Sequence, residues 1–244
     1  MLAATTIKSH WNGKWIWCQN PGRQENTFAF FRRRFETGED CRLDIDITAD
    51  TFYMLYVDGR FLHRGPARAH LSQYSFDRFS VQIGAGRHVI AVLVHHVGQV
   101  CACYELGKPG LLVDARVPGQ DLSSGPSWKA WDTRAYAPRP AMLCHFGWQE
   151  DIDYREYPTG FEKLDFDDSD RPFAVQVEEV VWKNLSLRDI PTFDYIRKAP
   201  VNVSTGNFTE GEQGDFHITA SHRVRRPLQA NAALPLSMKR NQYC

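Results

Sequence analysis

The sequence predicts an all-β fold, a sandwich or jelly roll, because short strand-like runs alternate with turn signals along most of its 244 residues. The run over residues 86–96 is apolar without alternation and rich in β-branched residues, which is typical of a strand covered on both faces. No segment before Pro172 shows the sustained 3.6-residue periodicity of a helix. We therefore expect packed sheets, with residues 86–96 at the centre of the core.

The first strands are expected at residues 14–17, 27–35 and 41–48. The third of these alternates strictly between apolar and polar side chains, so one of its faces should be wet. Later strands are expected at 111–117, between two Pro-Gly pairs, and at 127–131.

A hairpin is expected where residues 52–57 meet residues 60–63 across Asp58-Gly59, a pair typical of two-residue turns. Gly65-Pro66 then bends the chain away from the sheet, which leaves Arg64 and Arg68 on a loop.

The end of the chain differs in composition. From about Thr209 it is rich in Gly, Glu, Gln, Ala, Arg and Asn and poor in large apolar groups. We expect a β-sandwich region over residues 11–195 and an irregular or disordered tail over 196–244, either a linker or the truncated start of a further domain.

Composition limits the partners. Lys plus Arg balance Asp plus Glu at 29 each, so no global field attracts nucleic acid or an anionic membrane surface. No apolar stretch approaches the roughly 20 residues of a membrane span, and the first ten residues lack the basic start of a signal peptide. We expect a cytoplasmic protein whose six cysteines are mainly reduced thiols.

Familiar enzyme motifs are missing from the sequence: it contains no GxSxG, P-loop, GxGxxG or HExxH. His95 and His96 are adjacent and would face opposite sides of a strand, so they cannot bind one metal together. We expect no cofactor, no resident transition metal and no catalytic residue.

Two clusters of carboxylates remain as candidates. In the first, Glu150 and Asp153 lie beside Trp148 and Tyr154, so hydroxyl acceptors sit next to aromatic faces as a sugar site needs. The alternative interpretation is an exposed polar strand edge. These four residues are the leading candidates for sugar contact.

The second cluster holds Asp165, Asp167 and Asp168. Aspartates crowded in a loop usually bind their own backbone, and calcium bound by the same oxygens is the competing interpretation.

The sequence resembles the N-terminal, non-catalytic β-sandwich region of bacterial-type α-L-rhamnosidases. The resemblance covers roughly residues 11–195, its stretches occur in the same order, and RGPAR after a strand-turn-strand is the most specific of them. The stretches are WIW at 15–17, FAFFRRRF ending at Phe35, ITADTFYMLYVDGRFLHRGPAR at 47–68, the strand at 86–96, SWKAW at 127–131, GWQEDIDYREYPTGF at 147–161, DFDDSDRPFA at 165–174 and LRDIP at 187–191.

The resemblance implies a jelly roll similar to galactose-binding domains, which in the family precedes a helical barrel that carries the catalytic carboxylates. No barrel follows here, so we expect a carbohydrate-binding-like accessory module that is inactive alone, with rhamnose-containing glycans and a glycosidase catalytic domain as partners. One alternative is a structural domain that packs on a catalytic domain and binds no sugar. The other is an active glycosidase that uses carboxylates around Glu150 and Asp165.

Three roles remain open for Arg64 and Arg68. They can brace the loop by binding a carboxylate such as Asp77 or backbone carbonyls, form an interface with a partner domain, or contact a ligand directly. We include both among the candidate sugar-binding residues.

Overall fold

The structure of the chain is a computed structural model that describes residues 6–22, 24–102, 104–143, 147–178, 181–182, 184–195, 203–210, 216–224 and 242–243. The described residues form strands and loops, and they include no helix that could cross a membrane. The chain divides into two units, Met1–Pro191 and Thr192–Cys244. The all-β fold expected from the sequence is confirmed.

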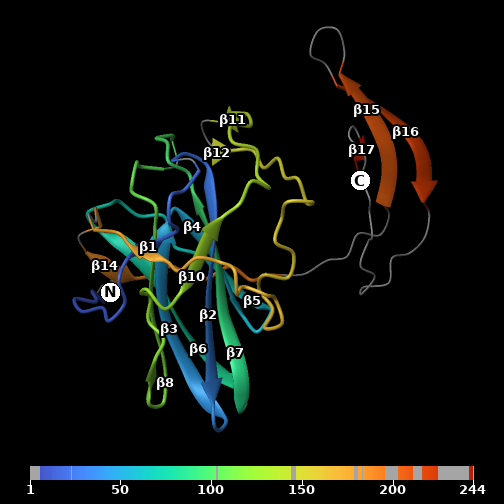
Figure 1. Cartoon of the computed structure of the whole chain (residues 1–244). Coiled ribbons are helices and arrows are strands. Elements are labelled where there is room, and N and C mark those ends of the chain that lie inside the picture. The colour runs from blue at the N-terminus through green and yellow to red at the C-terminus, as the bar shows by residue number, and fades with distance from the viewer. Residues whose placement is uncertain are drawn as a thin grey trace. The chain divides into compact units, whose positions relative to one another are not determined.

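One layer of the first unit is a five-stranded antiparallel sheet (Figure 1). Its order is β10 (Lys129–Asp132), β2 (Thr27–Thr37), β7 (Gly86–His96), β4 (Phe52–Val57) and β5 (Arg60–Gly65). Strands β2 and β7 pair along their whole length, from Thr27 opposite His96 to Thr37 opposite Gly86. The unbroken apolar run of β7 thus occupies the centre of this sheet, as predicted.

The other layer is a seven-stranded sheet (Figure 1). Its path is β13 (Val175–Gln176), β1 (Ile16–Trp17), β8 (Gly110–Val117), β3 (Cys41–Asp50), β6 (Tyr74–Ile83) and β14 (Leu185–Leu187), and β9 (Gln120–Asp121) pairs with β8. Strand β14 runs parallel to β6, whereas the other pairs are antiparallel. The two edge strands of the sheet, β13 and β14, therefore come from a part of the chain that lies far in sequence from the central strands β3 and β8.

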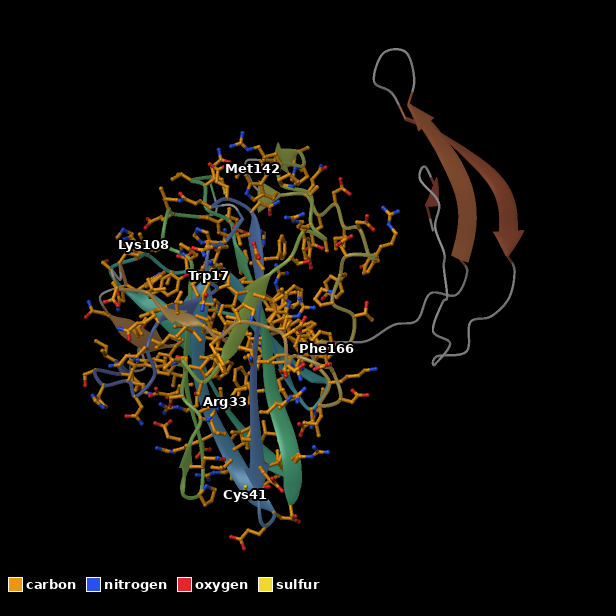
Figure 2. All side chains as sticks on the ribbon, in the orientation of Figure 1. Trp17, Arg33, Cys41, Lys108, Met142 and Phe166 are labelled. Atoms are coloured by element: carbon orange, nitrogen blue, oxygen red, sulfur yellow. The ribbon has the colours of Figure 1, made fainter. Side chains whose placement is uncertain are left out.

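The core lies between the two sheets, and Trp17 is among the side chains that fill it (Figure 2). Alternate residues of the central strands enter it, so the strict alternation in β3 places Leu43, Ile45 and Ile47 inside with at most 1% of their surface exposed. Burying each such side chain stabilises the fold by about 1.5–3 kcal/mol.

The opposite face of β3 is less wet than its alternation predicts. Asp46 is buried, and its carboxylate binds Lys8 at 2.7 Å and Arg78 at 2.6 Å, while Thr48 is fully buried and donates to the Ser75 carbonyl. The expectation was wrong for this end of the strand because the chain near Lys8 runs over it.

The β4–β5 hairpin turns at Asp58-Gly59, as predicted. Both residues have positive φ, 50° and 80°, which is the conformation of the two-residue turns that fit the twist of paired strands. The Asp58 carboxylate also accepts the backbone N–H of Val89 at 2.8 Å and contacts His88 at 2.7 Å. The turn is thus fixed to the neighbouring strand β7.

A covering segment, defined here as residues 133–168, packs on the outer face of the five-stranded sheet. Phe166 of this segment is labelled in Figure 2. The segment and the sheet share a second apolar cluster, which contains Phe28, Phe30, Trp131 and Phe161. Because of this cover, the five-stranded sheet is buried on both faces over much of its length. The segment includes a short pair of strands, β11 (Met142–Leu143) and β12 (Gly147–Trp148).

Arg32 of β2 binds the covering segment through several hydrogen bonds. Its side chain is fully buried, and it donates to the Asp168 carboxylate at 2.7 Å, to the Lys163 carbonyl at 2.9 Å and to the carbonyls of Phe161 and Phe166. Burial lowers the pKa of Arg32, and the hydrogen bond and charge of Asp168 oppose that shift. One guanidinium therefore holds several turns of loop against the sheet.

The second unit contains strands of its own. Strands β15 (Val203–Glu210), β16 (Phe216–Val224) and β17 (Gln242–Tyr243) form an antiparallel sheet in the order β16-β15-β17. These strands lie within residues 196–244, where a linker or the truncated start of a further domain is expected, and that assignment stays a prediction. The sequence signal for the second strand is the alternation of Phe216, Ile218 and Val224 across the strand period.

Candidate functional site

The loop that carries Arg64 and Arg68 is braced by a different arginine. Arg188, the residue after β14, donates two hydrogen bonds to the buried carboxylate of Asp77, which also accepts the hydroxyl of Tyr53. Arg188 thus binds Asp77, the carboxylate suggested as a partner for Arg64 and Arg68, whose side chains are exposed. A bracing role for Arg64 and Arg68 stays a prediction.

Gly65 is required by the same cluster. A Cβ atom at this position would overlap the Asp77 carboxylate and lie 2.7 Å from the Tyr53 hydroxyl. The bend at Gly65-Pro66, whose peptide bond is cis, thus passes directly over the buried ion pair of Asp77 and Arg188.

A small cavity lies between the outer face of the five-stranded sheet and the covering segment, and we name it the aromatic hollow. It has a volume of about 230 Å³. Six aromatic residues, the imidazole of His95 and three aliphatic residues make up most of its lining, and Arg64 and Glu150 supply the charges. The lining residues are Phe28, Phe52, Tyr53, Met54, Arg64, Leu93, His95, Tyr136, Glu150, Ile152, Tyr154 and Tyr157.

Stacked rings form one wall of the aromatic hollow. Phe28 lies opposite His95 in the β2–β7 pair, and their rings stack at 4.0 Å between centroids, while Tyr136 stacks on the other face of Phe28 at 3.5 Å. Phe52 is the next residue across, opposite His95 in the β7–β4 pair. Consecutive antiparallel strands therefore present one row of rings, as cross-strand pairing requires.

The tyrosine hydroxyls of this wall stay protonated. Burial raises the pKa of Tyr136, and neighbouring Tyr157 and Glu150 raise it further; burial also raises the pKa of Tyr157. Both phenols can therefore donate hydrogen bonds across the physiological pH range.

His95 is neutral in the folded protein. Burial lowers its pKa to about 3, and the charges of His96 and Arg64 contribute to the shift. Its Nε2 lies 2.9 Å from Oδ1 of Asn26. The aromatic hollow thus contains an uncharged imidazole beside the Arg64 cation.

Stability should therefore depend on pH through His95. The unfolded chain binds this proton near pH 6.5 and the folded chain only near 3, so between these values the unfolded state carries more protons. The contribution of neutral His95 is complete above pH 6.5 and is lost as pH falls, by at most about 1.4 kcal/mol per pH unit. Urea unfolding at pH 7.5 and 4.5 should show a smaller loss for His95→Phe than for the wild type. Equal losses would show that His95 is not held neutral.

The structure brings three of the predicted residues together. Arg64, Glu150 and Tyr154 come from three separate stretches of chain and line the aromatic hollow. The Arg64 guanidinium lies 5.0 Å from the centre of the Phe52 ring, close enough for a cation–π contact. Tyr154 is 70% exposed, and its ring is 5.8 Å from that of Tyr157.

Two other candidates do not line the aromatic hollow. Trp148 is half-buried in β12 and donates its indole N–H to the Val97 carbonyl at 2.9 Å, so it attaches the covering segment to the sheet. Asp153 binds the Arg155 guanidinium at 2.8 Å, and this hydrogen bond lowers the pKa of Asp153 to about 2. Trp148 and Asp153 thus bind other groups of the protein, and their contact with a sugar stays a prediction.

Arg68 lines a second cavity, which we name the polar hollow. It has a volume of about 540 Å³ and lies between the loops at 66–73 and 98–105. Its lining includes Asp50, His70, Tyr104 and Glu105. The two arginines of the RGPAR loop therefore line different cavities: Arg64 lines the aromatic hollow and Arg68 lines the polar hollow.

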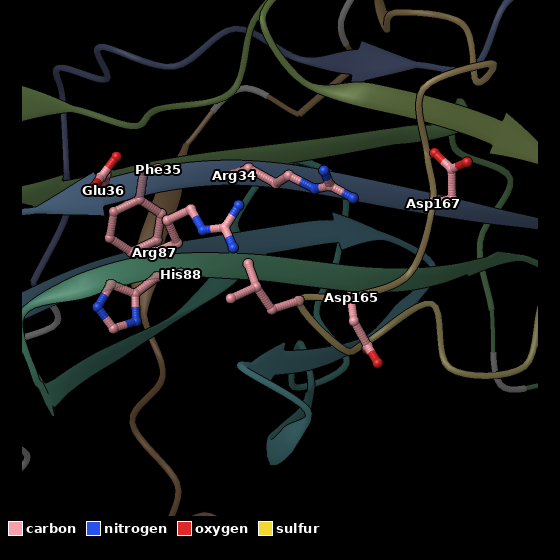
Figure 3. Close-up of a pocket in the computed structure, with 8 residues that line it drawn as sticks. Arg34, Phe35, Glu36, Arg87, His88, Asp165 and Asp167 are labelled. Atoms are coloured by element: carbon pink, nitrogen blue, oxygen red, sulfur yellow. The ribbon is translucent and has the colours of Figure 1, made fainter.

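The calcium candidates are not arranged as a site. Figure 3 shows Asp165 and Asp167 on the covering segment beside Arg34 and Arg87, in a cavity of about 710 Å³. Asp168 is turned inward, where it binds Arg32, and Arg34 lies 3.0 Å from its other oxygen. Within the described ranges, no three histidine, cysteine or acidic side chains converge as metal ligands.

The glycosidase alternative is also weakened by this arrangement. Glu150 lines the aromatic hollow, whereas Asp165 lines the cavity of Figure 3. Glycoside hydrolysis needs an acid and a nucleophile or base on the two sides of one bond. Glu150 and Asp165 therefore do not face each other across either of these two cavities.

Sequence reasoning missed most of the ring wall. From the sequence, Phe28 and Phe52 are expected only as strand residues, and His95 is expected as a single buried or edge histidine. The sequence signal was that alternate residues of a strand lie on the same face of a sheet. Residues 28 and 30 of β2, and residues 52 and 54 of β4, therefore share the outer face of the sheet on the two sides of β7.

The fold and cavities together define a β-sandwich module whose ligand-sized hollow lies on the outer face of one sheet. No family model and no curated protein sequence matches the chain. Its structure is similar to that of the GH78 family rhamnosidase of Bacillus sp. GL1, with 27% identity, 84% of this chain covered, 23% of that chain covered and a TM-score of 0.70.

Two other solved structures share the fold. The α-L-rhamnosidase from Aspergillus terreus matches at 17% identity over 85% of this chain and 25% of its own, with a TM-score of 0.59. The α-L-rhamnosidase from Dictyoglumus thermophilum matches at 17% identity over 86% of this chain and 25% of its own, with a TM-score of 0.58. The chain thus spans about a quarter of the length of these enzymes, and the predicted resemblance to one domain of α-L-rhamnosidases is confirmed.

Proposed function

We propose that this chain is a carbohydrate-binding accessory module of an α-L-rhamnosidase-type glycoside hydrolase, and that the aromatic hollow takes the sugar. The observation that carries the proposal is the meeting of Arg64, Glu150 and Tyr154 over a wall of stacked rings. Apolar cavities with a few convergent polar groups are the usual form of small-ligand sites.

The chemistry of the hollow suits a sugar ring. Aromatic faces pack against the C–H faces of a sugar, Glu150 accepts hydrogen bonds from hydroxyl groups, and Arg64 donates to hydroxyl or ring oxygens. Met54, Leu93 and Ile152 offer an apolar surface to the methyl group of a 6-deoxy sugar such as rhamnose. At about 230 Å³, the hollow is smaller than the roughly 300–1,000 Å³ of drug-sized sites, which fits one sugar residue.

The proposed function of this chain does not include catalysis. The solved α-L-rhamnosidases are about 3.4 times as long as this chain, because 85–86% of this chain covers only 25% of theirs. Because Glu150 and Asp165 line separate cavities, we propose that this chain binds without cleaving.

Isothermal titration with methyl α-L-rhamnoside, beside methyl β-galactoside, tests the proposal. We expect weak saturable binding of the rhamnoside, near a millimolar Kd, which corresponds to about −4 kcal/mol. Tyr154→Ala should weaken it at least tenfold, because Tyr154 is an exposed ring at the hollow. Phe193→Ala, which removes a ring that is 74% exposed and lines none of the three cavities described above, is the matched control and should bind like the wild type.

A docking role is the second candidate, and exposed apolar side chains where the chain leaves the sandwich favour it. Ile190 of the first unit is 54% exposed, and Phe193 of the second unit is 74% exposed. Exposed apolar side chains of this size are the kind that a partner domain would cover. If a folded sample takes up neither sugar, the carbohydrate-binding proposal fails and docking on a catalytic domain becomes the function to pursue.

A further inference from the structure

The polar hollow adjoins the aromatic hollow. Thr51 lines the polar hollow, and the next residue, Phe52, lines the aromatic one. Tyr104 of the polar hollow makes a T-shaped contact with Phe52, with ring centroids 5.1 Å apart and planes at 85°. Two aromatic rings in contact therefore separate the cavities.

Arg64 also contacts Phe52, and it lies in the aromatic hollow. Its guanidinium lies 5.0 Å from the centre of the Phe52 ring and lines the aromatic hollow. Four residues later, Arg68 lines the polar hollow. The RGPAR loop thus supplies one exposed cation to each cavity.

The exposed groups of the polar hollow carry both signs of charge. Arg68 is exposed, and Glu105, with 51% of its side chain exposed, lies 3.5 Å from Nε2 of His70. The buried carboxylate of Asp50 is already bound, to His96 at 2.8 Å and to the hydroxyl of Thr51 at 3.1 Å. Mixed donors and acceptors around one ring, that of Tyr104, suit a neutral polyhydroxylated ligand better than an ion.

We propose that the two hollows are adjacent subsites of one oligosaccharide-binding groove. The aromatic hollow holds the terminal sugar residue, and the polar hollow holds the next one, with Phe52 and Tyr104 forming the ridge below the linkage. This inference rests on the proposed function and extends its ligand from a monosaccharide to a chain of at least two residues. The second residue then binds as an intramolecular partner of the first, so affinity rises without a stronger single contact.

Titration with methyl α-L-rhamnoside and with a rhamnosyl-glucose disaccharide tests the groove. We expect the disaccharide to bind the wild type at least tenfold more tightly than the monosaccharide. The double variant Arg68→Met/Glu105→Gln should remove this gain, because it removes the positive charge of Arg68 and the negative charge of Glu105 from the second subsite. The matched control is Arg87→Met, which alters the separate cavity of Figure 3 and should keep the full gain.

The outcomes separate the two proposals. If both sugars bind the wild type equally, the groove is wrong, while the single-residue site stands. If the double variant keeps the gain and melts at the wild-type temperature, the second residue lies outside the polar hollow and the inference also fails. If neither sugar binds, the proposed function itself fails and the groove fails with it.

Discussion

Replacing Asp168 with alanine is expected to lower the free energy of unfolding by about 3–5 kcal/mol, because removing one partner of a buried ion pair leaves the other charge uncompensated. The Arg32 side chain has no exposed surface, and 7% of the Asp168 side chain is exposed. Arg32 would keep its carbonyl acceptors but lose the only carboxylate that it is seen to bind among the described residues. Urea unfolding measures the loss.

Asp165→Asn is the matched control for Asp168→Ala, because Asp165 lies three residues away on the same segment and is exposed. It should unfold at nearly the wild-type urea concentration. The double variant Arg32→Met/Asp168→Leu should recover much of the lost stability, since apolar side chains can replace a buried pair. A wild-type midpoint for Asp168→Ala would mean that the pair does not hold the covering segment.

Replacing Arg188 with methionine is expected to cost a similar amount, about 3–5 kcal/mol, because the Asp77 carboxylate would remain buried with only the Tyr53 hydroxyl as a direct partner among the described side chains. The side chains of Arg188 and Asp77 are 7% and 2% exposed. Arg188 also follows β14, so its loss should loosen the edge of the seven-stranded sheet beside β6.

Arg68→Met tests the rival assignment, in which an arginine of the RGPAR loop braces Asp77. The Arg68 side chain is exposed, so this variant should unfold at a midpoint much closer to the wild type than Arg188→Met. The reverse order of the two midpoints would show that the loop is braced as the sequence alone suggested.

Much of the fold could be predicted because each strand carries its own local signal. The alternation of β3, the apolar run of β7 and the Asp58-Gly59 turn act over a few residues, and the structure shows all three. The covering of β3 near Asp46 could not be predicted, since it depends on Lys8, which is 38 residues away in sequence.

The candidate site could be predicted only in part. Arg64, Glu150 and Tyr154 were selected for their chemistry, and the structure brings them together. Trp148 was selected for the same reason, but whether an indole faces a cavity or a carbonyl depends on tertiary packing that no local pattern encodes. The cytoplasmic location stays a prediction.

We propose that the aromatic hollow is the sugar site, and the decisive comparison is between Arg64→Met and Arg87→Met in the rhamnoside titration. Both changes remove an arginine, one from the aromatic hollow and one from the cavity of Figure 3. We predict that Arg64→Met weakens binding at least tenfold and that Arg87→Met binds like the wild type. Binding that survives Arg64→Met but is lost in Arg87→Met would contradict the account and move the site to the other cavity.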